Sequence, residues 1–530
     1  MAFAALWGAV IMSLGRHWPA LLVALSAVFL IAPIWAVDLP AMPDLPAHLA
    51  CFYLLAGGIK DPHLAHFYRL DWQFVPNLAS EIVVPALSKW LGLVPAAKLF
   101  LSAAVALWVF GAAAIQRALF GRVGVATLMA AFFAYNANFF WGFMNYDFTA
   151  GLDLVVFAGW IATANWPRIR RIALFTVVVT VVYFCHLFAA AVLLLMMGCF
   201  ELDALIRAKA IFSRRMLARA IDLAVLVAPS ALAFVLLKPK AADGGHLEFN
   251  LLDTWDDRIG AAFQAYFDQP AYIVIGLLAL LWIVGLWREW FRVHPSMRIV
   301  LTVLLACVVL MPEWALGGWG VDLRLPAILG AVAFASVEFR IPVRWQGALA
   351  AIAVAGLAFS AAGAGGNWAY YDRQYAEFRA TLKDSPPGTR IMTVLDGDAM
   401  GLASDQPYWH MAEFAILDRQ GFSPLLFTTA GQHVVRVQPE FQAIAAATAQ
   451  QGSPPDVGEL ADLAANEVGD DKDILEEFPY LLLFQCHFDE VVVVRSGGKP
   501  SPAPQLLALR HRGSFFDLYD VRRDDACTRP

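Results

Sequence analysis

A carboxylate and an imidazole occur four residues apart near the N-terminus, at Asp44 and His48. Pro46 between them suits the first turn of a helix, which we expect to begin near Asp44 and to end at Gly57-Gly58. Asp44 can cap this helix, or the pair can share a proton, bind a cation or accept the proton of a substrate hydroxyl. The spacing alone favours a capping Asp44 and a solvated His48.

Other polar residues flank strongly apolar segments. Asp71 and Asn77 lie in an aromatic stretch that suits either a membrane-interface belt or a binding site. The remaining candidates are Asn145 and Asp147 at an outer turn between two spans, Arg324 at the outer start of a span, and His186 at half depth. Polar and ionisable groups at membrane depth are functional candidates by default. An arginine can bind phosphate through two donors, although Arg324 could also pair with Asp322 or extend to the interface. His186 could instead cap a neighbouring carbonyl.

Composition sets the class of protein in which these residues act. The chain has 530 residues, of which 60% are hydrophobic and 15% charged, and its mean hydropathy is +0.61. A typical soluble protein is about 45–50% apolar and about 25% charged. These values exclude a water-soluble globule and a disordered chain, and the net charge of −6 gives no basic surface for nucleic acid.

Apolar segments of roughly 20 residues predict membrane-spanning helices. About eleven such segments occur, at Trp18–Val37, Lys98–Ala118, Val123–Phe140, Phe148–Ala164, Ile172–Phe184, Leu187–Phe200, Ile221–Leu237, Ala271–Trp287, Ile299–Ala315, Leu325–Phe339 and Trp345–Ala362. The two segments beside His186 are too short to cross separately at full thickness. They predict a hairpin whose tip stops inside the membrane, against protein or a wet cavity.

The distribution of lysine and arginine predicts the orientation. Basic residues concentrate in alternate loops, for example at Arg168–Arg171 and Arg207–Arg219, which the positive-inside rule places in the cytoplasm. The N-terminus is then inside, and three segments face outward: a long first loop (38–97), a loop over 238–270 and the tail after Gly366. We therefore expect a membrane domain over 1–366 and an exported α/β domain over 367–530.

The polar tail has alternating apolar runs and helix-like stretches. We expect strands at Arg390–Leu395, Pro424–Thr428, Tyr480–Phe484, Glu490–Arg495, Leu506–Arg510 and Phe515–Val521. We expect helices at Tyr370–Lys383, His410–Gln420, Phe441–Ala449 and Val457–Ala465. Cys486 and Cys527 are the only cysteines of the tail, and an exported compartment allows them to form a disulfide.

The layout and several short motifs resemble the GT-C glycosyltransferases, which are integral membrane enzymes that use polyprenyl-phosphate-linked sugars. One span followed by a long outer loop with an early acidic residue is typical of that family, and Asp44 is similar to this position. The motifs that carry the resemblance are Asp44-Leu45-Pro46-Ala47-His48, Asp71-Trp72 with Pro76-Asn77, Cys185-His186-Leu187, Tyr408-Trp409-His410 and Phe422-Ser423-Pro424-Leu425-Leu426-Phe427.

The resemblance implies an α-helical polytopic protein of the bacterial inner membrane that moves a sugar from a lipid-linked donor to an acceptor on the outer face. Asp44 would remove the acceptor proton, with inversion at the anomeric carbon, and His48 would orient it. Arg324 or His186 would stabilise the departing phosphate, and the other substrate-binding candidates are Asp71, Asn77, Asn145 and Asp147.

Several alternatives stay open at this point. The acceptor could be a glycan, a lipid or a protein, and a divalent cation could assist, although no residue is assigned as its ligand. Membrane lipid is an expected partner and nucleic acid is not. Asp38 competes with Asp44, but it directly follows the first span, where a carboxylate can simply mark the interface. A transporter or flippase for an amphiphile and a non-catalytic membrane scaffold are the two competing functions, and the absence of a visible internal repeat makes transport less favoured.

Overall fold

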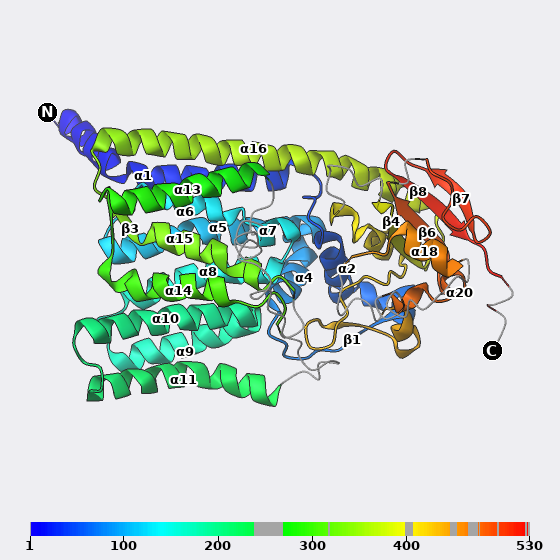
Figure 1. Cartoon of the computed structure of the whole chain (residues 1–530), viewed down its shortest axis with the longest axis horizontal. Coiled ribbons are helices and arrows are strands. Elements are labelled where there is room, and N and C mark those ends of the chain that lie inside the picture. Colours follow the sequence, from blue (N-terminus) through cyan, green and yellow to red (C-terminus); the bar gives the residue numbers. More distant parts are fainter. Residues whose placement is uncertain are drawn as a thin grey trace.

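The computed structural model describes residues 2–237, 269–315, 319–397, 406–445, 453–464, 475, 478–495, 498–524 and 527. The predicted outer loop over 238–270 therefore lies almost entirely outside the described residues. The described chain forms a long helical bundle with an α/β region at one of its ends (Figure 1).

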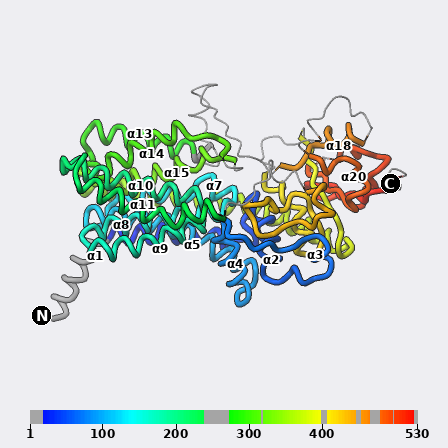
Figure 2. The backbone as a smooth tube through the Cα atoms, turned by 90° about the horizontal axis from the view of Figure 1, so that it is seen from below, coloured from blue at the N-terminus to red at the C-terminus, as the bar shows by residue number. Residues whose placement is uncertain are grey.

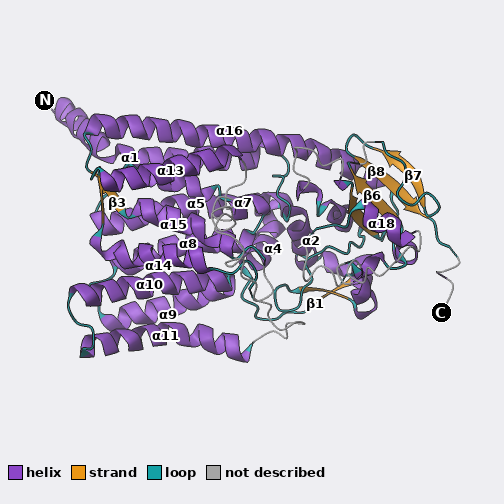
Figure 3. Cartoon of the chain, viewed as in Figure 1, coloured by secondary structure: helices purple, strands orange, loops and turns teal. Residues whose placement is uncertain are grey.

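The bundle contains most of the apolar helices, which run alongside one another (Figures 1 and 3). Its helices are α1 (Ala2–Ala36), α5 (Leu93–Phe120), α6 (Ala126–Ala130), α7 (Ala137–Trp141), α8 (Met144–Ala162), α9 (Arg168–Cys185), α10 (Leu187–Arg207), α11 (Arg214–Leu236), α13 (Gln269–Trp287), α14 (Arg298–Leu310), α15 (Leu325–Ala335) and α16 (Val343–Thr381). A short antiparallel pair, β2 (Phe291–Val293) with β3 (Val337–Phe339), lies at the end away from the α/β region.

Five of the described helices are long and apolar enough to cross a membrane by themselves: α1 from Trp18, α5, α10, α11 and α16. The protein is thus a multi-pass membrane protein. The predicted span over 123–140 is divided into α6, a 3-10 turn and α7, and the predicted span over 325–339 contains an α15 of only 11 residues. The number of about eleven crossings stays a prediction.

The prediction of two short helices around His186 is wrong. Helix α9 has 18 residues and α10 has 21, which correspond to about 27 and about 32 Å at 1.5 Å per residue. Both helices extend past the charged residues that limited the predicted segments. Arg171 is buried within α9 because its guanidinium pairs with Glu201 at 3.1 Å and stacks 3.4 Å from the Trp160 ring.

The α/β region is built on a four-stranded sheet with the order β4-β6-β8-β7. Its strands are β4 (Ile391–Leu395), β6 (Glu490–Val494), β7 (Leu507–Arg512) and β8 (Phe516–Val521), so four predicted strands are confirmed. Strand β4 is parallel to β6, and the other pairs are antiparallel. Helices α17 (Phe414–Arg419), α18 (Val457–Ala464) and α20 (Phe484–His487) accompany the sheet.

Two predicted strands are wrong. Residues 424–428 form turns and irregular backbone, and residues 480–484 contain a 3-10 turn and the start of α20. Both runs are apolar because they fill the core of the α/β region, where Leu425, Leu426 and Leu481 are almost fully buried.

The first outer loop belongs to the α/β region. It forms α2 (Leu45–Leu55), α3 (Pro62–Phe67), β1 (Tyr68–Leu70) and α4 (Ala79–Leu91), and β1 pairs antiparallel with β5 (Val435–Val437) of the tail. Seen from below, the first outer loop, in blue, lies among the yellow and orange segments of the tail (Figure 2).

Helix α16 runs unbroken through the expected domain boundary at Gly366 and ends at Thr381. It therefore includes most of the predicted helix Tyr370–Lys383.

The C-terminal disulfide is confirmed. Cys486 and Cys527 are bonded, with their Cα atoms 5.1 Å apart, within the usual range for a disulfide. The bond joins the end of α20 to the C-terminal segment. The four other cysteines are free.

Candidate active site

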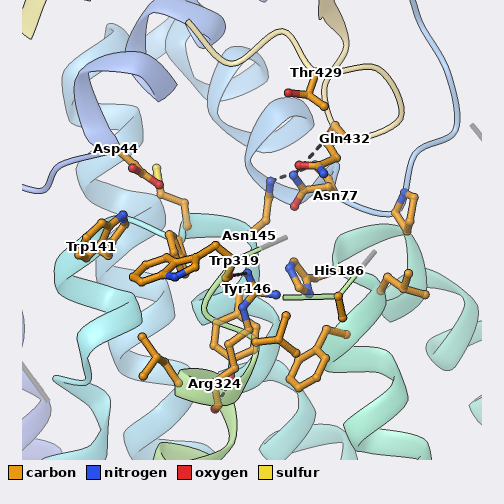
Figure 4. Close-up of a pocket in the computed structure, with 18 of the residues that line it drawn as sticks. Asp44, Asn77, Trp141, Asn145, Tyr146, His186, Trp319, Arg324, Thr429 and Gln432 are labelled. Atoms are coloured by element: carbon orange, nitrogen blue, oxygen red, sulfur yellow. Dashed lines mark hydrogen bonds between the residues drawn. The ribbon is translucent and has the colours of Figure 1, made fainter. Parts of the chain in front are cut away.

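A cavity of about 1160 Å³ lies where the bundle meets the α/β region. Six of the eight candidate residues line it: Asp44, His48, Asn77, Asn145, His186 and Arg324. They come from α2, the segment before α4, the start of α8, the α9–α10 junction and the start of α15 (Figure 4). The structure thus brings these six residues together, and their roles in a functional site stay predictions.

Asp44 is held at the N-terminus of α2 without using its carboxylate as a cap. Its backbone N–H donates to the Trp141 carbonyl at 3.0 Å, and no helix amide binds its side chain. The Trp141 side chain instead donates a hydrogen bond to the carboxylate. Gly142, with φ +99°, lies directly beside Asp44. The capping interpretation of Asp44 is thus wrong, and the carboxylate faces the cavity.

Burial controls the protonation of the Asp44 carboxylate. It raises the pKa of Asp44 to about 7, while His410 and the hydrogen bond from Trp141 partly oppose the rise. A carboxyl group with a pKa close to neutral suits a general base, because it can both take up and release a proton at the working pH.

His48 is buried, and not solvated as the sequence suggested. It lies one turn after Asp44 on α2, stacks on Phe52 and meets the edge of Phe427 at a centroid distance of 5.0 Å. The pKa of His48 is lowered to about 3, mainly by burial and also by the neighbouring His433 and His410, while a hydrogen bond with the Gly142 backbone partly opposes the shift. His48 is therefore a neutral hydrogen-bonding group.

Two histidines of the tail, to which the sequence assigned no role, complete this part of the cavity. His410 Nε2 lies 3.9 Å from Asp44 Oδ1, and His410 Nδ1 lies 3.3 Å from Glu413 Oε1. His433 Nδ1 lies 3.2 Å from Glu81 Oε1 of α4. The rings of His48, His410 and His433 all contact Phe427. The only sequence signal was the dense aromatic motif Tyr408-Trp409-His410.

Asn77 and Asn145 link the first outer loop to the bundle. The Asn145 side chain accepts from the Ser80 amide at 2.6 Å and donates to the Asn77 carbonyl at 2.9 Å. The Asn77 side chain donates to the Gln432 carbonyl at 3.3 Å, in the loop before β5. These bonds fix the segment between β1 and α4 against α8, so Asn145 has a positioning role.

His186 and Arg324 lie on the side of the cavity nearer the bundle, away from Asp44 (Figure 4). His186 Nδ1 accepts from the Ala189 amide at 3.3 Å, so the neutral ring carries its hydrogen on Nε2. The sequence interpretation had His186 capping a carbonyl, but the ring instead caps the Ala189 amide at the start of α10. The Arg324 guanidinium donates to the Trp319 carbonyl at 3.2 Å, and its buried Nε has no hydrogen-bond partner among the described residues.

Asp71 and Asp147 do not line the cavity. Asp71 accepts a hydrogen bond from Gln73 at 2.8 Å and lies 3.9 Å from Arg436, beside the β1–β5 pair. Asp147 is buried in α8, where Asn136 donates to one of its oxygens at 2.9 Å. The prediction that these two residues bind substrate therefore gains no support from the cavity.

The lining residues do not form a cluster suited to a metal ion. Among the described residues, the one group of three potential ligands within 4.8 Å of one another is Cys486, Asp524 and Cys527. Two of these are joined in the disulfide, and all three lie outside the cavity lining. We therefore derive no step that uses a metal.

A bundle of apolar helices with an α/β region closing a cavity at one end is a polytopic membrane fold, as the sequence predicted. The chain is similar in structure to ArnT from Cupriavidus metallidurans bound to undecaprenyl phosphate, with a TM-score of 0.51 and 12% sequence identity. The match covers 95% of this chain and 98% of that one. At this identity the likeness establishes the fold. Neither a protein-family profile nor a curated protein sequence matches the chain.

Proposed function

We propose that the protein transfers a sugar from a polyprenyl-phosphate-linked donor to an acceptor hydroxyl at the outer face of the bacterial inner membrane. The observation that carries the proposal is a single cavity with a near-neutral carboxyl group at Asp44 and an incompletely paired guanidinium at Arg324. A base and an anion-binding group are the two functions that a displacement at an anomeric phosphate requires.

Asp44 acts at the acceptor end. Its ionised carboxylate takes the proton of the acceptor hydroxyl while the hydroxyl oxygen attacks the anomeric carbon. The bond from that carbon to the phosphate oxygen breaks in the same step, so the configuration inverts. The Trp141 hydrogen bond and the adjoining Gly142 hold the carboxylate in place, and neutral His48 provides a hydrogen-bonding group one helical turn away.

Arg324 and His186 act at the leaving-group end. As the bond breaks, negative charge develops on the polyprenyl phosphate, and donors placed beforehand stabilise it. Arg324 offers its unpaired Nε, and the Nε2 hydrogen of His186 is free of the cap that Nδ1 makes. The aromatic rings of Phe143, Tyr146 and Phe188 surround the guanidinium at 5.4–5.8 Å and fix its position.

One side of the cavity is apolar and suits a lipid tail. Its lining continues along one half of α10 and α11 through small or apolar residues that include Ala190, Leu194, Val227 and Phe234. Helix α11 lies at the edge of the bundle (Figure 1), and only 17% of its most apolar segment is buried against the rest of the protein. An apolar path beside Arg324 supports a donor that keeps its polyprenyl tail among the helices.

The alternatives receive less support. On α10 the lining stops at Leu194, whereas the helix continues to Arg207, so the described lining is confined to one end of the bundle. A transporter needs access to both membrane faces. A passive scaffold needs no cavity of this size beside a carboxyl group of raised pKa.

Undecaprenyl phosphate provides a test that does not require the acceptor to be identified. We expect the purified protein in lipid nanodiscs to bind this lipid by native mass spectrometry, and to release it from an undecaprenyl-phosphate-linked sugar when an envelope extract supplies the acceptor. Binding without any release in the presence of extract would favour the transporter. Absence of binding would contradict the proposed function.

A further inference from the structure

His410 and Glu413 form a buried pair behind the carboxylate of Asp44. The His410 side chain is 2% exposed and the Glu413 side chain is fully buried. Glu413 Oε1 lies within hydrogen-bond distance of His410 Nδ1, at 3.3 Å, and accepts a hydrogen bond from the Ser423 hydroxyl at 3.1 Å. These contacts fix the orientation of the imidazole. Because Nδ1 faces Glu413, the other ring nitrogen, Nε2, is the atom that faces Asp44, at 3.9 Å.

The orientation of this pair gives it a chemical role. When the His410 imidazole is protonated, its Nδ1–H donates to the Glu413 carboxylate and its Nε2–H points toward Asp44. We infer that Glu413 and His410 keep Asp44 ionised and aimed at the acceptor, so that both are positioning residues for the base. The inference rests on the proposed function and extends it to residues that do not touch the reacting atoms.

The charges around His410 agree with a protonated ring. Burial alone would lower the pKa of His410, but the charge and hydrogen bond of Glu413 and the charge of Asp44 raise it. Among the described residues, the other titratable groups near this cluster are His48 and Cys51 on α2, Tyr68 on β1, Glu81 on α4 and His433 in the loop before β5. His48 is neutral and His433 faces Glu81, so His410 is the imidazole that faces Asp44, and its raised pKa favours the protonated form.

Removing the imidazole tests this inference. In His410→Gln, Asp44 loses its neighbouring cation, so its pKa should rise by about one unit or more. For a rise of one unit, the ionised fraction of Asp44 falls about fivefold at neutral pH and about tenfold at lower pH, and transfer falls with it. Raising the pH should restore most of the rate, which a purely structural defect would not allow. Glu413→Gln keeps the hydrogen bonds and removes the charge, so it should shift the pKa in the same direction by less.

The measurement has to report on Asp44 independently of transfer. The infrared band of the protonated carboxyl group, assigned by its absence in Asp44→Asn, gives the pKa of Asp44 in wild type and variants. His66→Gln is the matched control, because His66 is exposed on α3 and does not line the cavity.

The outcomes separate the two proposals. A raised pKa in His410→Gln and an unchanged one in His66→Gln are expected. An unchanged pKa in both His410→Gln and Glu413→Gln would overturn the inference even if the protein is an active transferase. A raised pKa in a protein that transfers no sugar would leave the electrostatic arrangement intact and overturn the proposed function.

Discussion

Gly142 lies directly against Asp44, and this contact leaves little space for a side chain. A Cβ atom at position 142 would lie 3.1 Å from the Cβ of Asp44 and 3.4 Å from its backbone nitrogen. The φ angle of +99° at Gly142 is also one that other residues rarely adopt. The turn between α7 and α8 and the start of α2 are therefore packed together through a glycine.

Substituting this glycine should displace the base. We expect Gly142→Ala to lower transfer about 10²-fold, because small displacements of a catalytic group have effects of this order. The folded state should lose about 1 kcal/mol through the strained φ. Gly363→Ala in α16 is the control, because nothing lies within 4 Å of its added Cβ. Transfer assays and thermal unfolding of both variants would measure the two losses. A wild-type rate of transfer by Gly142→Ala would contradict the packing argument.

The raised pKa of Asp44 predicts the pH dependence of transfer. A base must be ionised, so kcat/KM should fall as the pH decreases through about 7 and should level off above it. Because Asp44 and His410 interact, the apparent pKa of this profile describes the titration of the pair and not of Asp44 alone. A kcat/KM profile in nanodiscs between acidic and alkaline pH would measure it. An unperturbed carboxyl group would instead give a decline near pH 4, and that result would contradict the burial of Asp44.

Much of the fold follows from local sequence patterns, but contacts between distant segments do not. The β-branched run Glu490–Val494 identified strand β6, and the carboxylate, proline and imidazole at 44–48 located one end of the cavity. The approach of His410 to Asp44 depends on the tail folding back over α2, which no spacing encodes. Likewise, Arg171 falls within α9 only because Glu201 of α10 and Trp160 of α8 surround its charge.

Arg324 should be needed for the departure of the phosphate. Replacing it in Arg324→Gln removes the charge, and we expect transfer to fall by about 10²–10³-fold, as for loss of a donor to a developing anion. The measurement is single-turnover transfer, together with undecaprenyl phosphate binding. Arg122→Gln is the control, because Arg122 pairs with Glu338 on the surface, 71% exposed, and such pairs contribute about 0–1 kcal/mol. Equal rates in the two variants would remove Arg324 from the proposed mechanism.

The orientation in the membrane is open to a labelling test. The basic segment at 207–219 should lie inside, and the α/β region should lie outside. Cysteines introduced at Ser213 and Ser453, in a background without the four free cysteines, should differ in their reaction with an impermeant maleimide on intact cells. We expect labelling at position 453 alone. Labelling at 213 and protection at 453 would invert the topology and place the cavity on the cytoplasmic side.

The most direct test of the central claim compares two conservative carboxylate substitutions. Asp44→Asn keeps the size of the side chain and removes the base, so transfer from an undecaprenyl-phosphate-linked sugar should fall by about 10²–10⁴-fold in a folded protein. Asp38→Asn is the matched control, because Asp38 is exposed and lies outside the cavity lining. It should retain nearly the full rate. Full activity in Asp44→Asn, or a larger loss in Asp38→Asn, would contradict the assignment of Asp44 as the base.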